Sequence, residues 1–267
     1  MSEADSSEMR LLAAAAVARE AGALARRRFL DSSFEVRLKG PHDYLTEVDG
    51  ETEELIAGRL LQVFPCDGFL GEETTGRPAG DSGALWVVDP IDGTSNFARG
   101  VAHFCVSIAC LRGGEVEVGV IYDPIRDELF CARLGGGARL NGEAIRPSNA
   151  TTLLNTSVEV GWSARHGVER YLDLVRRVAL AGAAPLRSGS GALGIVYVAA
   201  GRRDGYVEQH MKPWDCLAAM LIVREAGGYV SDFLAGDGLA KGNPILAAAP
   251  GLREALMSAV AIEGIGS

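Results

Sequence analysis

Two aspartates three positions apart, Asp89 and Asp92, follow the apolar run at residues 86–88 and lead into the small polar residues 93–96. Pro, Asp, Gly, Ser and Asn all favour turns, so a plain turn is the simplest interpretation. Two neighbouring carboxylates also repel each other unless a cation neutralises them, and oxygen ligands suit Mg²⁺. The pair is therefore a candidate metal site as well as a candidate turn.

Other acidic residues stand at predicted element boundaries. Glu72 and Glu73 follow Gly71, and Asp215 stands at the start of a predicted helix, where it could simply act as a cap. Two Mg²⁺ ions held by such groups can clamp the attacking and leaving oxygens of a phosphoryl transfer. A helix that begins at Thr94 would also favour a phosphate at its N-terminus. Metal-binding carboxylates beside an anion-binding turn predict phosphate-ester chemistry.

The hydrophobic patterns predict an α+β first half and an α/β second half. Capping residues at 5–7 and an Ala-rich run predict a helix over about residues 8–29, and a second helix follows Asp49 and ends at Pro65. Short β-rich runs between residues 85 and 133 predict an antiparallel sheet with a hairpin turn at 112–114. Strands and helices then alternate, which predicts a layered α/β half with helices at about residues 165–180, 191–201, 213–228 and 251–261.

Composition narrows the class of protein. The 267 residues, 48% of them hydrophobic, suffice for one large domain or two closely packed halves. The net charge of -9 argues against wholesale nucleic-acid binding. Five cysteines without a CxxC pair favour a reduced, cytoplasmic protein. The acidic first residues are unlike a signal peptide, and no apolar stretch is long enough for a membrane span.

The acidic motifs occur in an order that resembles the inositol monophosphatase family. Glu72-Glu73, DPIDGTSNF at 89–97 and PWDCLAAMLIVREAGG at 213–228 carry the resemblance, which covers nearly the whole chain. That family belongs to a superfamily of Mg²⁺-dependent, lithium-sensitive phosphatases. The resemblance implies a layered αβαβα sugar-phosphatase fold of class α/β, a single family domain with halves at 1–148 and 149–267, and a homodimer.

The resemblance also implies roles for individual residues. Thr94, helped by Glu72, would orient the attacking water, and Asp49 would support that water or the metal shell. Two or three Mg²⁺ ions would be held by Glu72, Asp89, the Ile91 carbonyl, Asp92 and Asp215. Phosphate and alcohol contacts would come from Asp92, Gly93, Thr94, Ser190, Gly191, Ala192, Glu208 and Asp215.

We therefore expect Mg²⁺-dependent hydrolysis of a phosphate monoester on a small polyol, with inositol monophosphate as the first candidate. Fructose 1,6-bisphosphate, histidinol phosphate and 3′-phosphoadenosine 5′-phosphate are alternative substrates. A regulatory binding protein that acts through RNA-associated partners is an alternative of another class. Gly191 and the segment Gln209-His210-Met211 depart from the family pattern beside the expected alcohol site, so substrate identity and the role of His210 stay open.

Overall fold

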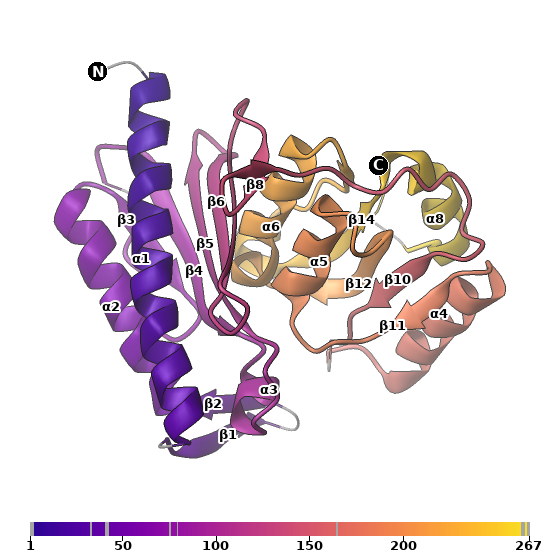
Figure 1. Cartoon of the computed structure of the whole chain (residues 1–267), viewed down its shortest axis with the longest axis horizontal. Helices are drawn as coiled ribbons and strands as arrows, with labels where there is room; N and C mark the ends of the chain where they lie inside the picture. The colour runs from indigo at the N-terminus through magenta and orange to yellow at the C-terminus, as the bar shows by residue number, and fades with distance from the viewer. Residues whose placement is uncertain are drawn as a thin grey trace.

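The structure is a computed structural model that describes residues 3–32, 34–40, 43–74, 76–78, 80–163, 165–262 and 265, with only the backbone described at 3–5, 39 and 43. The elements stack in five layers (Figure 1), which confirms the αβαβα arrangement expected from the sequence. Two sheets alternate with three layers of helices. These helices are α1 (Glu3–Asp31) with α2 (Glu47–Val63), then α5 (Gly191–Ala199) with α6 (Pro213–Glu225), then α4 (Val168–Leu180) with α8 (Arg253–Val260).

The first sheet has seven strands within the described residues and is antiparallel except where β3 pairs with β4. The turn between β5 and β6 is formed by Gly113 and Gly114, with φ of 61° and 85°, as a two-residue hairpin turn with left-handed backbone requires. The predicted hairpin is therefore confirmed. In spatial order the strands are β3 (Gly68–Gly71), β4 (Ala84–Asp92), β5 (Cys105–Arg112), β6 (Glu115–Asp123), β7 (Glu128–Arg133), β8 (Ala138–Leu140) and β9 (Glu143–Ala144).

Several predicted helix starts differ from the structure. The second helix begins at Glu47, so Asp49 lies in its first turn rather than before it, and the last begins at Arg253. The first helix begins at Glu3, so residues 5–7 lie inside it and the N-cap predicted there is wrong. Acidic residues suit the first turn of a helix, and nothing in that stretch breaks one. The helix predicted from residue 165 begins at Val168, because Gly167 is extended and acts as its N-cap.

Helices α5 and α6 are buried between the two sheets, which explains why their sequences are almost uniformly apolar. Helix α6 approaches β6 closely at Gly119, where an added Cβ would lie 2.4 Å from the carbonyl oxygen of Ala218. Gly227, with φ of 89°, follows the end of α6 and confirms the predicted glycine cap.

The second sheet mixes parallel and antiparallel pairs. Strand β10 is parallel to β11 and β12, whereas β14 runs antiparallel to β12 and β13. The spatial order is β11 (Ala184–Leu186), β10 (Ser157–Val160), β12 (Gly205–Met211), β14 (Asn243–Ala248) and β13 (Tyr229–Val230). Shorter elements complete the chain: β1 (Val36–Gly40), β2 (Asp43–Thr46), α3 (Thr94–Ala98), α7 (Gly238–Lys241) and a 3₁₀ turn at Pro250–Leu252.

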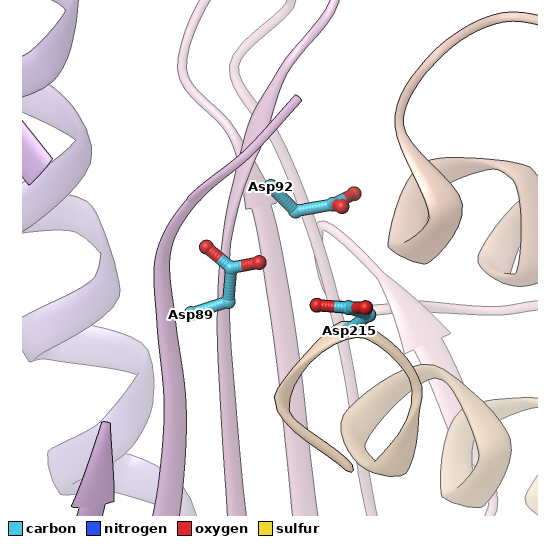
Figure 2. A group of neighbouring side chains, drawn as sticks. All are labelled: Asp89, Asp92 and Asp215. Atoms are coloured by element: carbon cyan, nitrogen blue, oxygen red, sulfur yellow. The ribbon is translucent and has the colours of Figure 1, made fainter. Parts of the chain in front are cut away.

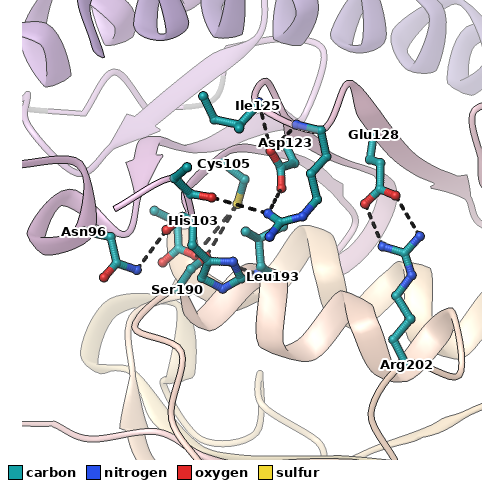
Figure 3. Close-up of polar contacts among 12 residues, drawn as sticks. Asn96, His103, Cys105, Asp123, Ile125, Glu128, Ser190, Leu193 and Arg202 are labelled. Atoms are coloured by element: carbon teal, nitrogen blue, oxygen red, sulfur yellow. Dashed lines mark hydrogen bonds and ion pairs between the residues drawn. The ribbon is translucent and has the colours of Figure 1, made fainter. Parts of the chain in front are cut away.

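The two halves share one hydrophobic cluster. It includes Val87 and Ile121 of the first sheet, Leu193 and Leu217 of the middle helices, and Ile245 of the second sheet. A bidentate ion pair between Arg202, after α5, and Glu128 of β7 also joins the halves (Figure 3). The predicted boundary at residues 148 and 149 falls in the connection between β9 and β10 and stays a prediction. Among the described residues, no helix is both long and apolar enough to cross a membrane.

Candidate active site

The end of strand β4 turns two aspartates toward one side. In a regular strand, residues three positions apart point to opposite faces. Here Asp89 pairs with Ser107 and Asp92 pairs with Cys105, so two residues of β4, Pro90 and Ile91, oppose one residue of β5. This β-bulge inserts the extra residue that brings both carboxylates to the same side. The Oδ1 atom of Asp89 accepts a hydrogen bond from the Ile91 N–H at 2.9 Å, which stabilises the bulge.

A third carboxylate reaches these two from the other half of the chain. Asp215 lies in the first turn of α6, and its Oδ2 atom accepts the N–H of Lys212 at 3.2 Å. The Ser107 hydroxyl donates to the Trp214 carbonyl at 2.9 Å, so β5 holds the start of α6 in place. Figure 2 shows Asp89, Asp92 and Asp215 facing one another. One oxygen of each lies within 4.8 Å of the others.

The electrostatics of this cluster favour a cation. Burial raises the pKa of Asp89, Asp92 and Asp215 above the ordinary aspartate value. Repulsion among the neighbouring carboxylates raises the pKa of Asp89 and Asp215 further. A divalent ion bound between them would remove that repulsion, and carboxylate oxygens are the ligands that Mg²⁺ prefers. The donor set therefore fits Mg²⁺.

Glu72 lies at the edge of the same cluster. Its N–H donates to the carbonyl of Val88 at 3.2 Å, next to Asp89 in the chain. After burial, the charge of Glu72 is the largest cause of the raised pKa of Asp89. The structure thus places Glu72 near Asp89, and its role as a metal ligand stays a prediction.

Thr94 and Asp49 form a hydrogen-bonded pair next to the metal-binding carboxylates. The Thr94 hydroxyl, in the first turn of α3, lies 3.1 Å from Asp49 Oδ1 and 2.9 Å from the Ile91 carbonyl oxygen. Asp49 is fully buried, and its Oδ2 atom accepts the N–H and hydroxyl of Thr46 at 2.8 and 2.5 Å. Burial raises the pKa of Asp49 to about 6 despite these bonds. A carboxyl with that pKa can exchange protons near neutral pH.

Gly93 connects Asp92 to Thr94 in a conformation that other residues rarely adopt. Its φ is 103°, and an added Cβ would lie 3.0 Å from the His103 carbonyl oxygen. As predicted, α3 begins at Thr94, and its first intrahelical bonds run from Asn96 and Phe97 to the Gly93 carbonyl. The helix is therefore started by the turn that carries Asp92.

Asp92 also joins the two halves through helix α5. Its Oδ2 atom accepts the Ser190 hydroxyl and, at 2.8 Å, the Ala192 N–H. Its Oδ1 atom accepts the Gly191 N–H at 3.3 Å. The predicted substrate contacts Ser190, Gly191 and Ala192 thus direct polar groups at Asp92 and position its carboxylate.

A polar cavity of about 160 Å³ opens beside Asp92 and Asp215. Glu208 lines it, is nearly buried, and accepts the Tyr206 hydroxyl at 2.7 Å. Burial raises the pKa of Glu208 to about 7. Several lining residues were not predicted, although Tyr206 stands two positions before Glu208 on β12 and strand alternation places both on one face. These residues are Glu159, Trp162, Arg187 and Tyr206.

The residues that depart from the family pattern divide between two places. Gly191 and Met211 both line the 160 Å³ cavity, and a Cβ added to Gly191 would lie 2.6 Å from Met211 Cε. His210 instead lines a separate cleft of about 600 Å³ between α4 and β14, with its ring 6.2 Å from that of His166. The structure therefore places Met211, and not His210, beside the candidate active site.

Comparison with known proteins agrees with this geometry. The sequence model of the inositol monophosphatase family matches residues 5–263. The chain belongs to this family. Nus factor SuhB of Xylella fastidiosa is 45% identical over 201 residues, which cover 74% of this chain and 72% of that protein. Inositol-1-monophosphatase of Mesorhizobium japonicum is 39% identical over 232 residues, covering 85% of this chain and 86% of its own.

A solved structure of a relative matches the fold over nearly the whole chain. The crystal structure of the extragenic suppressor protein suhB of Bartonella henselae superposes with a TM-score of 0.88 at 38% identity. The match covers 96% of this chain and 99% of that one. Membership of the inositol monophosphatase family supports phosphatase chemistry, and the family's dependence on Mg²⁺ agrees with the cluster of Asp89, Asp92 and Asp215.

Proposed function

We propose that this protein hydrolyses a phosphate monoester of a small polyol in a Mg²⁺-dependent reaction, with inositol monophosphate as the first substrate to test. The observation that carries the proposal is the convergence of Asp89, Asp92 and Asp215 within 4.8 Å, beside the hydrogen-bonded Thr94 and Asp49. Carboxylates, a hydroxyl and a second carboxyl beside a polar cavity are the groups that metal-assisted ester hydrolysis needs.

The acidic residues would hold two or three ions. When bound, Mg²⁺ neutralises the phosphate dianion, lowers the pKa of a bound water and stabilises the leaving oxygen. The ligands would be Glu72, Asp89, the Ile91 carbonyl, Asp92 and Asp215.

Thr94 would orient the attacking water. The Thr94 hydroxyl can donate its one proton to Asp49 or to the Ile91 carbonyl. The lone pairs of the Thr94 oxygen are then available to accept a hydrogen bond from water. A water held in this way presents its own lone pair to phosphorus. The water oxygen would bond to phosphorus while the bond between phosphorus and the alcohol oxygen breaks, and the proton that the water loses is balanced by the proton that the departing alcohol oxygen takes up. The N–H groups of Gly93 and Thr94 would receive the phosphate.

The cavity supports a small alcohol rather than a nucleotide. Its volume of about 160 Å³ lies below the roughly 300–1,000 Å³ of sites for drug-sized ligands. Glu208, Asp215 and Ser190 line it with oxygen atoms that can accept or donate hydrogen bonds to hydroxyl groups. A polyol offers several hydroxyls for this purpose. Fructose 1,6-bisphosphate and histidinol phosphate remain alternative substrates of the same chemistry, whereas the small cavity disfavours 3′-phosphoadenosine 5′-phosphate.

Phosphate release from a panel of these monoesters, with and without Mg²⁺ and with added Li⁺, tests the proposal. We expect Mg²⁺-dependent release that is fastest from inositol monophosphate and inhibited by Li⁺. Asp89→Asn should abolish it, whereas Asp173→Asn, at a half-exposed position of α4 outside the carboxylate cluster, should not. Turnover by the Asp89→Asn variant at the rate of the wild type would contradict the proposed metal site.

A second candidate function is regulatory binding through RNA-associated partners. Several relatives carry the name Nus factor SuhB, which supports testing it. A stoichiometric partner in a pull-down, with no turnover of any phosphate ester, would favour this function over hydrolysis. Homodimerisation stays a prediction, which a measurement of molecular mass in solution tests. A cytoplasmic location also stays a prediction, which cell fractionation tests.

A further inference from the structure

Glu53 is a buried carboxylate that neither the sequence motifs nor the proposed mechanism uses. It lies on α2 one turn after Asp49 and has no solvent exposure. Its Oε2 atom accepts the N–H of Glu73 at 2.9 Å, whereas its Oε1 atom has no hydrogen-bond partner in the described part of the chain. No ion pair of Glu53 is found among the described residues either. Burying a carboxylate with so little compensation is unfavourable, so a purely structural role explains it poorly.

The whole carboxylate of Glu53 packs against the backbone of Gly71. A Cβ built on Gly71 would lie 2.3 Å from the carboxyl carbon and from both oxygens of Glu53. A side chain at residue 71 would have to push this carboxylate aside, so the approach seen here depends on glycine. Glu53 and Gly71 therefore form a matched contact between α2 and the end of β3.

This contact fixes the turn that carries Glu72. On one side, the Glu72 N–H donates to the Val88 carbonyl of β4 at 3.2 Å. On the other side, Glu53 holds the next amide, that of Glu73. The backbone around Glu72 is thus attached both to the strand that bears Asp89 and to the helix that bears Asp49.

We propose that Glu53 is a positioning residue, which anchors the turn at residues 71–73 and so aims Glu72 at the metal site. The inference rests on the proposed role of Glu72 as a metal ligand. Asp49 and Glu53 are four residues apart and share one face of α2. Helix α2 would therefore align both Asp49, beside Thr94, and the turn that carries Glu72. Groups that orient metal ligands typically change metal affinity by about 10- to 100-fold when they are removed.

Two conservative variants separate position from charge. Glu53→Gln keeps the length of the side chain and an oxygen for the Glu73 N–H but removes the charge. Glu53→Asp keeps the charge but is one methylene too short to reach that N–H. Thr52→Val is the matched control, because Thr52 is the neighbouring buried residue of α2 and its hydroxyl has no hydrogen-bond partner within the described residues.

The measurement is binding of Mn²⁺, a paramagnetic substitute for Mg²⁺, to each full-length protein by electron paramagnetic resonance, alongside the Mg²⁺ concentration that half-saturates phosphate release. We expect Glu53→Asp to weaken Mn²⁺ binding by about 10- to 100-fold, with Glu53→Gln and Thr52→Val staying near the wild type. At saturating Mg²⁺ the KM for the ester should be unchanged. A circular dichroism melt in EDTA checks that each variant folds.

Three results would overturn the inference. Weak binding by Glu53→Gln with normal binding by Glu53→Asp would show that charge matters and not position. Equal weakening in Thr52→Val would show a general loosening of α2, and normal binding in every variant would show no role. If the wild type binds Mn²⁺ but hydrolyses no ester, the proposed function fails while the positioning role is still measured. If the wild type binds no Mn²⁺, both fail.

Discussion

Asp215→Asn should stabilise the metal-free protein while it abolishes the response to Mg²⁺. The three aspartates of the cluster repel one another when no cation is bound, and all three have a raised pKa. Asparagine is close in shape to aspartate, and its side-chain oxygen can still accept the Lys212 N–H that Asp215 accepts. The substitution therefore removes a charge and little else.

The size of the effect follows from the distances. Unit charges 4.8 Å apart repel by about 3 kcal/mol at an effective dielectric constant near 20. Burial and this repulsion raise the pKa of Asp215 to about 8, so folding at neutral pH requires the group to take up a proton; asparagine avoids that cost, and we expect the variant to gain about 1–3 kcal/mol in EDTA. For a chain of this size, each kcal/mol corresponds to a rise in Tm of about 2–4 °C. With Mg²⁺ at 1,000 times its Kd, the wild type gains about 4.1 kcal/mol that the variant lacks, which exceeds the advantage of the variant in EDTA.

Thermal melts of both proteins in EDTA and in excess Mg²⁺ test this reasoning. The order of stability should reverse, with the variant higher in EDTA and the wild type higher in Mg²⁺. Asp123→Asn is the control, because Asp123 is a buried aspartate paired with Arg126 at 2.8 Å and should lose stability in both conditions. A lower Tm for Asp215→Asn in EDTA, or a Mg²⁺-induced rise equal to that of the wild type, would refute the assignment of a repulsive metal site.

Three further predictions concern the pair beside the metal site, its titration and the alcohol cavity. Thr94→Val removes the hydroxyl beside Asp49 and should lower kcat by about 10²- to 10⁴-fold in a phosphate-release assay, whereas Thr94→Ser should keep most of the activity; equal loss in both would argue against the hydroxyl. Burial raises the pKa of Asp49 from 3.8 to about 6, so its contribution to the stability of the metal-free protein is complete below about pH 4 and is lost as the pH rises through 6. Urea unfolding in EDTA should show a fall of about 3 kcal/mol from this group across that range, and Asp49→Asn should flatten it; an unchanged slope would contradict the shift. Gly191→Ala should cost less than about 1 kcal/mol of stability, because its Cβ would meet Met211 Cε, the end of a flexible side chain that can shift; a loss above about 3 kcal/mol in a urea unfolding experiment would contradict this.

The sequence predicted the order of elements well because hydrophobic periodicity is a local property. The antiparallel sheet between residues 85 and 133, the hairpin at Gly113 and Gly114, and the apolar helix from Pro213 are all confirmed. The parallel pairing of β3 with β4 was not predicted, because GFLG is too short for a pattern and its pairing depends on a distant strand. The start of the first helix was also wrong, since several residues at an acidic N-terminus can cap equally well.

For the site, the sequence determined which residues carry oxygen ligands and that their chemistry suits Mg²⁺. The tertiary structure alone decided how they meet. The bulge at Pro90 and Ile91 turns Asp89 and Asp92 to one side, and the Ser107 bond to the Trp214 carbonyl brings Asp215 to them from over a hundred residues away. Local sequence patterns predict neither the bulge nor this contact. A bulge is defined by its pairing with another strand, and a buried contact depends on the distant elements that exclude water from it. For the same reason the sequence did not indicate a role for Glu53, because that role depends on its contact with Gly71, a residue of another element.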